Sequence, residues 1–271
     1  MHAPGPAWTD WDAVAPIRAT AALPLLDWDT AVARIDAEDP VDGVIQLCPQ
    51  NGARARLAMD VEQVERLRQR YPQRRFRLHA NHRLARLPAL FYDASTVDRH
   101  WSSCFAPLAA LHRRLGADVY SLHAGRADYA DRAALVRGVA RLEQLFAGPV
   151  AVEGMYPSQR ERFHVDSSEG YRWLLQSGLA MAIDVSHVHI VRTQEGGFDE
   201  GLLDALLQSE RCVEVHLSHN DGRLDQHRSL PVEPPWWWPA VRRARAVRPD
   251  LAVLCESLAV ARPAEGRPVM L

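Results

Sequence analysis

Segments with two different hydrophobic periods alternate along the chain. In 212–217 the apolar side chains of Val213, Val215 and Leu217 occupy every second position, which predicts a strand with one apolar face. In 61–70 the apolar residues recur every three or four positions, which is the spacing of an amphipathic helix. Strands that alternate with helices in this way are typical of a parallel sheet.

Eight such strands can be counted. They are expected at Ile17–Ala22, Gly43–Cys48, Phe76–His79, Val119–His123, Val150–Glu153, Leu179–Asp184, Cys212–Leu217 and Leu251–Glu256. The helices between them are expected at Thr30–Ala37, Val61–Arg70, Thr96–Leu115, Arg132–Phe146, Tyr171–Gln176, Gly201–Gln208 and Pro239–Val247. No longer internal repeat and no low-complexity linker divides the chain. We therefore predict an α/β fold, with one (β/α)8 TIM-barrel domain over residues 1–271.

The end of the chain departs from this regular pattern. Only fifteen residues, Ser257–Leu271, follow the last predicted strand, and two of them are prolines. Proline interrupts a helix because it lacks the backbone N–H donor. The eighth helix is therefore expected to be short or missing.

From the third strand to the eighth, every predicted strand carries at its carboxyl end a side chain that can bind a metal ion. These residues are His79, His123, Glu153, Asp184, His216 and Glu256. In a (β/α)8 barrel the carboxyl ends of the strands form the face that carries the active site. Side-chain alternation points Asp184 into the barrel above Ala182. The same alternation places Arg77 and Glu214 inside the barrel, where we expect them to pair.

Three further candidate ligands lie close to these strand ends. They are His187, three positions after Asp184, and the pair Asp225 and His227. Each residue alone is more typical of a structural histidine or a helix cap, so only their convergence predicts a metal centre. Nitrogen and oxygen donors suit zinc, manganese or iron. One ion takes about four protein ligands, so nine candidates predict two or three ions that share bridging carboxylates.

Composition narrows the class of protein. The 271 residues are 47% hydrophobic and 24% charged, with a net charge of −2, which indicates a soluble globular protein. This charge gives no global support for nucleic-acid binding, although a local Arg-rich face could still supply it. No apolar run is long enough for a membrane span, and the N-terminal residues lack the pattern of a signal peptide, so we expect a cytoplasmic protein. The four scattered cysteines fit reduced thiols. The chain contains no lysine, which excludes Schiff-base chemistry and a P-loop.

Three smaller features have more than one interpretation. His82, His189 and His219 lie near the candidate ligands in the sequence, and each could replace one of them. Trp236–Trp238 can line a substrate mouth, contact a partner or cover the rim of the barrel. Gly196 and Gly197 indicate a mobile loop after the sixth strand, suited to a lid, although turn formation alone also explains them.

From about Phe76 to Glu256 the sequence resembles the xylose-isomerase-like metal barrels. Sugar isomerases and epimerases of this superfamily hold one metal ion with a quartet that matches Glu153, Asp184, His216 and Glu256. The apurinic-site endonucleases bind three zinc ions and add ligands that match His79, His123, His187, Asp225 and His227. These two branches imply an isomerase or a zinc-dependent endonuclease.

A third branch is more similar in its local sequence motifs. The multinuclear non-heme iron-dependent oxidases, of the methanobactin-biosynthesis type, have motifs that resemble AIDVSHVHI, GFDEGLLDAL, CVEVHLSHN, LDQH and PVEPPWW in this chain. This branch usually has Asn at the position of His187, and a Glu-Asn pair where this chain reads VEGMYP. The resemblance implies an oxidase that modifies a peptide or cysteine-derived substrate with O2.

The oxidase is our first functional hypothesis, with iron as the favoured metal and zinc or manganese as alternatives. One ion would be held by His79, His123 and Glu153, a second by Glu153, Asp184, His216 and Glu256, and a third by His187, Asp225 and His227. In the isomerase alternative, Glu153 and Glu256 would exchange a proton beside a carbonyl group. The expected partners are a peptide or small-molecule substrate and a partner protein or second copy of the chain, without nucleic acid or membrane.

Overall fold

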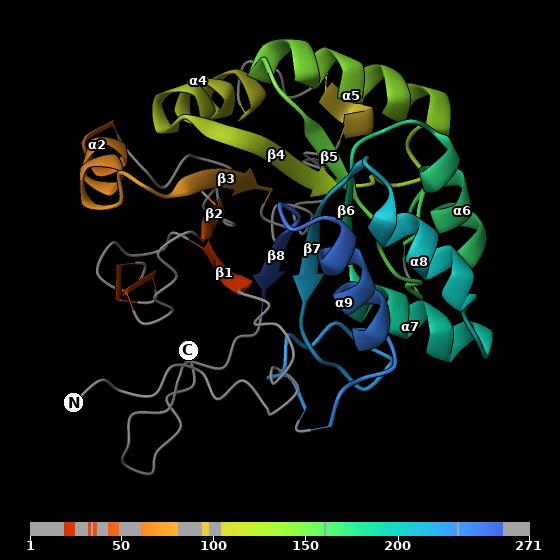
Figure 1. Ribbon diagram of the computed structural model, residues 1–271. Helices are drawn as coiled ribbons and strands as arrows, with labels where there is room; N and C mark the ends of the chain where they lie inside the picture. The colour runs from red at the N-terminus through yellow and green to blue at the C-terminus, as the bar shows by residue number, and fades with distance from the viewer. Residues whose placement is uncertain are drawn as a thin grey trace.

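Eight parallel strands close into a barrel in the order in which they occur in the chain (Figure 1). In this computed structural model the described residues are 19–24, 32–33, 35–36, 43–48, 61–80, 94–97, 104–159, 161–231 and 233–256. The strands are β1 (Ala19–Pro24), β2 (Val44–Cys48), β3 (Arg75–His79), β4 (Ala117–His123), β5 (Val150–Glu153), β6 (Met181–Asp184), β7 (Cys212–Leu217) and β8 (Ala252–Cys255). Pairing of β8 with β1 completes the ring.

The described helices lie on the outside of the barrel (Figure 1). They are α2 (Val61–Arg70), the 3-10 turn η3 (Ala94–Thr96), α4 (Ala106–Leu115), α5 (Arg132–Phe146), α6 (Ser168–Gln176), α7 (Val185–Glu195), α8 (Glu200–Gln208) and α9 (Trp238–Val247). The predicted (β/α)8 barrel is confirmed. Half of the predicted first helix, and the segment 257–271 in which a short or missing eighth helix was expected, lie outside the described residues.

The helix expected at Thr96–Leu115 is confirmed where the structure describes its length: Val97 is helical, a π-helical turn at 104–105 leads into α4 (Ala106–Leu115), and residues 98–103 lie outside the described part of the chain. Thr96 itself ends the 3-10 turn η3. No helix was predicted between the sixth strand and Gly201, but the structure has α7 there, so the loop that contains Gly196 and Gly197 follows this helix. Gly196 terminates α7 in the left-handed conformation, with φ of 73°, which glycine adopts without a steric penalty.

Side chains alternate between the two faces of the barrel wall as predicted. Val150 and Val152 of β5 pack outward into the main core with the helices. Ala151 and Ala182 point inward, where they form a small apolar layer with Val119. Small side chains below the carboxyl ends of the strands leave the inner space above them to the polar groups.

A buried ion pair crosses the interior of the barrel. Arg77 Nη1 donates to Glu214 Oε2 at 3.0 Å, which confirms the predicted pairing of these residues. Glu214 is 0% exposed and Arg77 is 3% exposed. Removing one partner of such a pair leaves an uncompensated buried charge. No helix among the described residues is long and apolar enough to span a membrane.

Close packing of α5 on the η3 turn gives a test of the fold. A Cβ atom added at Gly138 would lie 1.6 Å from the carbonyl oxygen of Ala94. Gly138→Ala would gain about 1 kcal/mol in helix propensity, but overpacking typically costs about 1–3 kcal/mol. We expect a net loss of stability of about 1 kcal/mol in chemical denaturation.

The matched control is Gly197→Ala. An added Cβ at Gly197 has no neighbour within 4 Å. Its free energy of unfolding should stay within about 0.5 kcal/mol of the wild-type value. Equal stability of the Gly138 and Gly197 variants would contradict the proposed close contact between α5 and η3.

Candidate metal centre

The barrel brings six of the predicted ligands to one face. His79, His123, Glu153 and Asp184 are the last residues of β3, β4, β5 and β6. His216 is the penultimate residue of β7, and Glu256 directly follows β8. Strand register places them at similar heights, because His123 pairs with Glu153, and Asp184 pairs with His216. The carboxyl ends of parallel strands thus deliver these side chains to a common layer.

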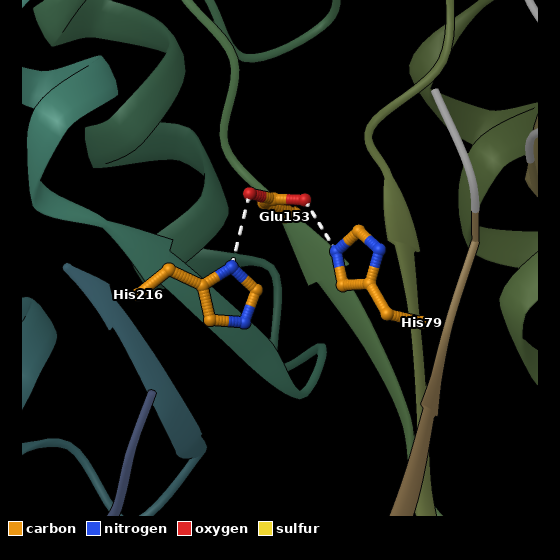
Figure 2. A group of neighbouring side chains, drawn as sticks. All are labelled: His79, Glu153 and His216. Carbon is orange, nitrogen blue, oxygen red and sulfur yellow. Dashed lines mark hydrogen bonds and ion pairs between the residues drawn. The ribbon is translucent and has the colours of Figure 1, made fainter. Parts of the chain in front are cut away.

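Glu153 lies at the centre of this layer (Figure 2). Its Oε2 lies 2.8 Å from His79 Nε2 and 3.3 Å from His123 Nε2. Its Oε1 lies 3.2 Å from His216 Nδ1 and 3.8 Å from His187 Nδ1. Each oxygen therefore faces a different pair of imidazoles, and Figure 2 shows His79 and His216 on opposite sides of the carboxylate. This arrangement suits a carboxylate that bridges two cations.

A second group of donors adjoins Glu153 on the side of His216. Ligand atoms of Glu153, Asp184, His216 and Glu256 all lie within 4.8 Å of one another. His216 Nδ1 lies 3.4 Å from Glu256 Oε1. The four residues come from four consecutive strands, β5 to β8, so the barrel itself fixes their separation.

Asp184 uses its two carboxylate oxygens differently. Oδ1 accepts hydrogen bonds from the backbone N–H groups of Ser186 at 2.6 Å and His187 at 3.2 Å, and so caps α7. Oδ2 is buried and has no hydrogen-bond partner. A buried carboxylate oxygen that accepts no hydrogen bond carries a large desolvation penalty, and Oδ2 lies 3.4 Å from its ion-pair partner, His187 Nε2. A cation at this oxygen would remove that penalty.

The third group consists of His187, Asp225 and His227. Asp225 Oδ2 lies 2.8 Å from His227 Nε2 and 3.4 Å from His187 Nε2. His187 Nε2 also lies 3.4 Å from Asp184 Oδ2, which joins this group to the second. His227 has a φ of 46°, a left-handed backbone that is uncommon outside glycine. This tight turn lets Asp225 and His227 face the same point despite their short spacing.

Backbone carbonyls orient two of the imidazoles. His79 Nδ1 donates to the carbonyl of Ala80 at 2.7 Å, which leaves Nε2 facing Glu153. His187 Nδ1 donates to the carbonyl of Gly154 at 2.8 Å, which leaves Nε2 facing Asp184 and Asp225. Histidine ligands of metal ions are commonly held in this way by their second nitrogen. All nine predicted ligands thus lie in one connected cluster.

Charges in the cluster shift the proton affinities strongly. Burial opposes charge on the imidazoles, yet the nearby carboxylates raise the pKa of His79, His187 and His216 well above the ordinary value and that of His227 to about 9. Burial also opposes ionisation of Glu153, but the surrounding imidazoles hold its pKa well below the ordinary value. The carboxylates of the site therefore stabilise positive charge on the groups that lie between them.

Two carboxyl groups at the same rim differ in their proton affinity. Burial and the like charges of Glu153 and Asp184 raise the pKa of Glu256, despite the opposing effect of His216. Burial also raises the pKa of Asp225, but hydrogen bonds from His187 and His227 outweigh it and depress that pKa. Among these groups, Glu256 is the carboxyl that takes up a proton more readily.

The alternative histidines do not join the cluster where the structure describes them. His219 forms a backbone bridge with Arg228, and burial lowers the pKa of its ring. His189 Nδ1 accepts a hydrogen bond from Trp236 Nε1 at 3.1 Å. His82 lies outside the described residues.

The tryptophan run has two separate environments. Trp237 and Trp238 are buried in the main core, which corrects the interpretation that they line a substrate mouth. Trp236 is half-buried beneath the guanidinium group of Arg192, whose carbon lies 4.3 Å from the ring centroid. The run therefore belongs mainly to the packing of α9 against the barrel.

The sequence did not reveal Tyr156 as a member of the site. Its ring centroid lies 4.8 Å from that of His187. Burial, followed by the charges of Asp225 and Asp184, raises the pKa of Tyr156 to about 12. Its phenol therefore stays protonated at neutral pH and can donate a hydrogen bond. Tyr156 belongs to no short motif, and only its proximity in the fold connects it with the ligands.

The raised imidazole pKa values predict that cation binding releases protons. A histidine must be deprotonated to bind a metal ion, so affinity for Zn2+ should rise with pH between about 6.5 and 9. Calorimetric titration in two buffers of different ionisation enthalpy would measure the protons released, at pH 6.5 and at pH 8. Fewer protons should be released at pH 8. An affinity independent of pH, with no release of protons, would contradict the predicted ligation.

Comparisons with known proteins support the fold. No protein-family model matches the chain, and no curated protein matches it by sequence. Endonuclease IV from Thermus thermophilus matches with a TM-score of 0.59 and 17% identity, over 88% of this chain and 91% of that chain. A D-tagatose 3-epimerase-like protein matches with a TM-score of 0.56 and 14% identity, over 79% and 81%. A xylose isomerase domain protein from Planctomyces limnophilus matches with a TM-score of 0.54 and 10% identity, over 88% and 89%. At the level of the fold, the expected resemblance to the xylose-isomerase-like barrels, endonuclease IV among them, is confirmed.

Proposed function

We propose that this protein is a multinuclear metal-dependent hydrolase of phosphodiesters. The observation that carries the proposal is the position of His187, whose Nε2 lies 3.4 Å from both Asp184 Oδ2 and Asp225 Oδ2. This histidine completes a third ligand group, as the sequence resemblance to the zinc-dependent apurinic-site endonucleases implies. A single-ion isomerase would leave that group without a role, and the iron oxidases usually have Asn at this position.

The charge of the centre supports an anionic substrate. Three divalent cations bring six positive charges, whereas Glu153, Asp184, Asp225 and Glu256 bring four negative charges. The loaded centre would therefore carry a net charge of roughly +2, which favours binding of a phosphodiester or another anionic substrate. When bound, the cations would generate a strong nucleophile from water at neutral pH and stabilise charge on the attacking and leaving oxygens.

Side chains of the site can accept a proton or donate a hydrogen bond during hydrolysis. Glu256 is the carboxyl whose pKa is raised, so it is the better suited of the rim carboxylates to accept a proton from the attacking water. The protonated phenol of Tyr156, beside His187, is placed to donate a hydrogen bond to an anionic oxygen of the substrate. Glu153 holds its place between the two sides of the centre through four imidazoles.

A substitution at His187 tests the proposal. The probe is bis(p-nitrophenyl) phosphate, and elemental analysis counts the bound ions. His187→Asn should reduce the number of bound zinc or manganese ions by one. It should also lower hydrolysis by about 100-fold or more, since loss of even an outer partner of a ligand costs about 10–100-fold.

The matched control is His219→Asn, which changes a histidine at the same rim that lies outside the cluster. It should retain both the ion count and the rate of hydrolysis. Wild-type protein that binds a single ion and cleaves no phosphodiester when loaded with zinc or manganese would refute the proposal.

A second candidate is the iron-dependent oxidase of a peptide or cysteine-derived substrate. The sequence likeness from AIDVSHVHI to PVEPPWW favours it, and mixed nitrogen and carboxylate donors around Glu153 suit iron in two oxidation states. Protein reconstituted with Fe2+ under anaerobic conditions should then consume O2 when mixed with a cysteine-containing peptide, as measured with an oxygen electrode. Hydrolysis by the zinc form without any peptide-dependent O2 consumption would exclude this candidate.

A further inference from the structure

A buried polar layer lies inside the barrel directly beneath the candidate metal centre. Gln46 of β2, Arg77 of β3 and Glu214 of β7 point into the interior and are 0%, 3% and 0% exposed. None of them is among the nine candidate ligands. Burying a carboxylate and a guanidinium group is unfavourable unless both are fully paired. Such a layer must therefore be held by specific contacts.

Glu214 is the residue on which these contacts converge. Its Oε1 accepts hydrogen bonds from Gln46 Nε2 at 3.0 Å and from His216 Nε2 at 3.1 Å. Its Oε2 accepts a hydrogen bond from Arg77 Nη1 at 3.0 Å. Donors on three different strands therefore fix the orientation of this single carboxylate.

Arg77 is itself held in place on the side away from His216. Its Nη1 donates to the carbonyl of Val213 at 2.7 Å, and its Nε donates to Asp118 Oδ1 at 3.1 Å. Asp118 also accepts hydrogen bonds from Arg75 near the amino-terminal end of the barrel. The guanidinium group thus neutralises the buried charge of Glu214 and does not reach the centre above.

The contact with His216 connects this layer to the metal centre. Residues two apart on a strand share one face, so Glu214 lies directly below His216 on β7. Because a carboxylate only accepts, His216 Nε2 carries the proton of this hydrogen bond. The other nitrogen, Nδ1, then faces Glu153 Oε1 at 3.2 Å and Glu256 Oε1 at 3.4 Å.

We propose that Glu214 is a positioning residue of the centre: its carboxylate fixes the orientation and tautomer of His216, so that Nδ1 binds a cation. The proposal rests on the metal centre of the proposed function. His79 and His187 are oriented by neutral backbone carbonyls, whereas His216 is oriented by a charged group. A negative partner increases the basicity of the ligating nitrogen, which strengthens its bond to the cation.

An amide cannot replace this carboxylate. The side chain at 214 meets donors at both of its oxygens, from Gln46 and His216 at one and from Arg77 at the other. The –NH2 group of a glutamine would face one of these donors and could not accept from it. Glu214→Gln therefore conserves volume while it removes the charge and one acceptor.

The first test is made on the wild-type protein and needs no substrate. With 15N-labelled histidine in the zinc-loaded protein, NMR should show that His216 is protonated at Nε2 and bound to the metal ion through Nδ1. His216→Gln identifies the corresponding signals by their loss. Binding of the metal ion through Nε2 would overturn the role of Glu214, whatever the activity of the protein.

The second test compares two variants that each remove the negative charge of one partner of Arg77. Glu214→Gln should weaken binding of one Co2+ ion by about 10–100-fold, and it should shift the visible absorption bands of the cobalt-loaded protein. Asp118→Asn, at the half-exposed end of the same network, should leave the affinity and the spectrum as in the wild type. Unchanged affinity and spectrum in a folded Glu214→Gln protein would overturn the proposal.

The two proposals can fail separately. Wild-type protein that binds cations through His216 Nδ1 but cleaves no phosphodiester would refute the hydrolase and leave the role of Glu214 supported. Conversely, cleavage by a protein whose His216 binds through Nε2 would support the hydrolase and refute the role of Glu214.

Discussion

The collection of like-charged carboxylates in one buried layer is the constraint on which the site depends. Glu153, Asp184 and Glu256 would repel one another strongly at such short separations unless positive charge lay between them. The imidazoles supply part of that charge when they are protonated, and divalent cations would supply it more compactly. The closed barrel makes this arrangement possible, because backbone pairing holds the strand ends together against the repulsion.

Much of this organisation could be predicted from the sequence. A strand-end position and the alternation of side chains were sufficient to place His79, His123 and Glu153 in one layer, since parallel strands in a closed ring have little freedom in register. The same alternation correctly paired Arg77 with Glu214 across the barrel. These predictions succeeded because they depend on the backbone geometry of strands, which varies little among barrels.

Other features could not be predicted, and for physical reasons. Helix α7 escaped notice because the polar residues Ser186 and His187 are buried together with apolar residues such as Val188, so polar and apolar positions do not separate into the two faces of an amphipathic helix. Tyr156 was missed because its place beside His187 depends on the path of a loop. The hydrogen bond between Glu214 and His216 depends on distances within the interior, which a pattern of residue types does not contain.

The two oxygens of the Asp184 carboxylate have different roles, which limits what a mutation at this position can show. One oxygen secures the start of α7, and the other is directed at the cluster. Folding and chemistry therefore place separate demands on the same side chain. Replacement of this aspartate would disturb both at once, whereas Asp225, on a loop at the rim, offers a position at which the chemistry can be altered while the architecture is preserved.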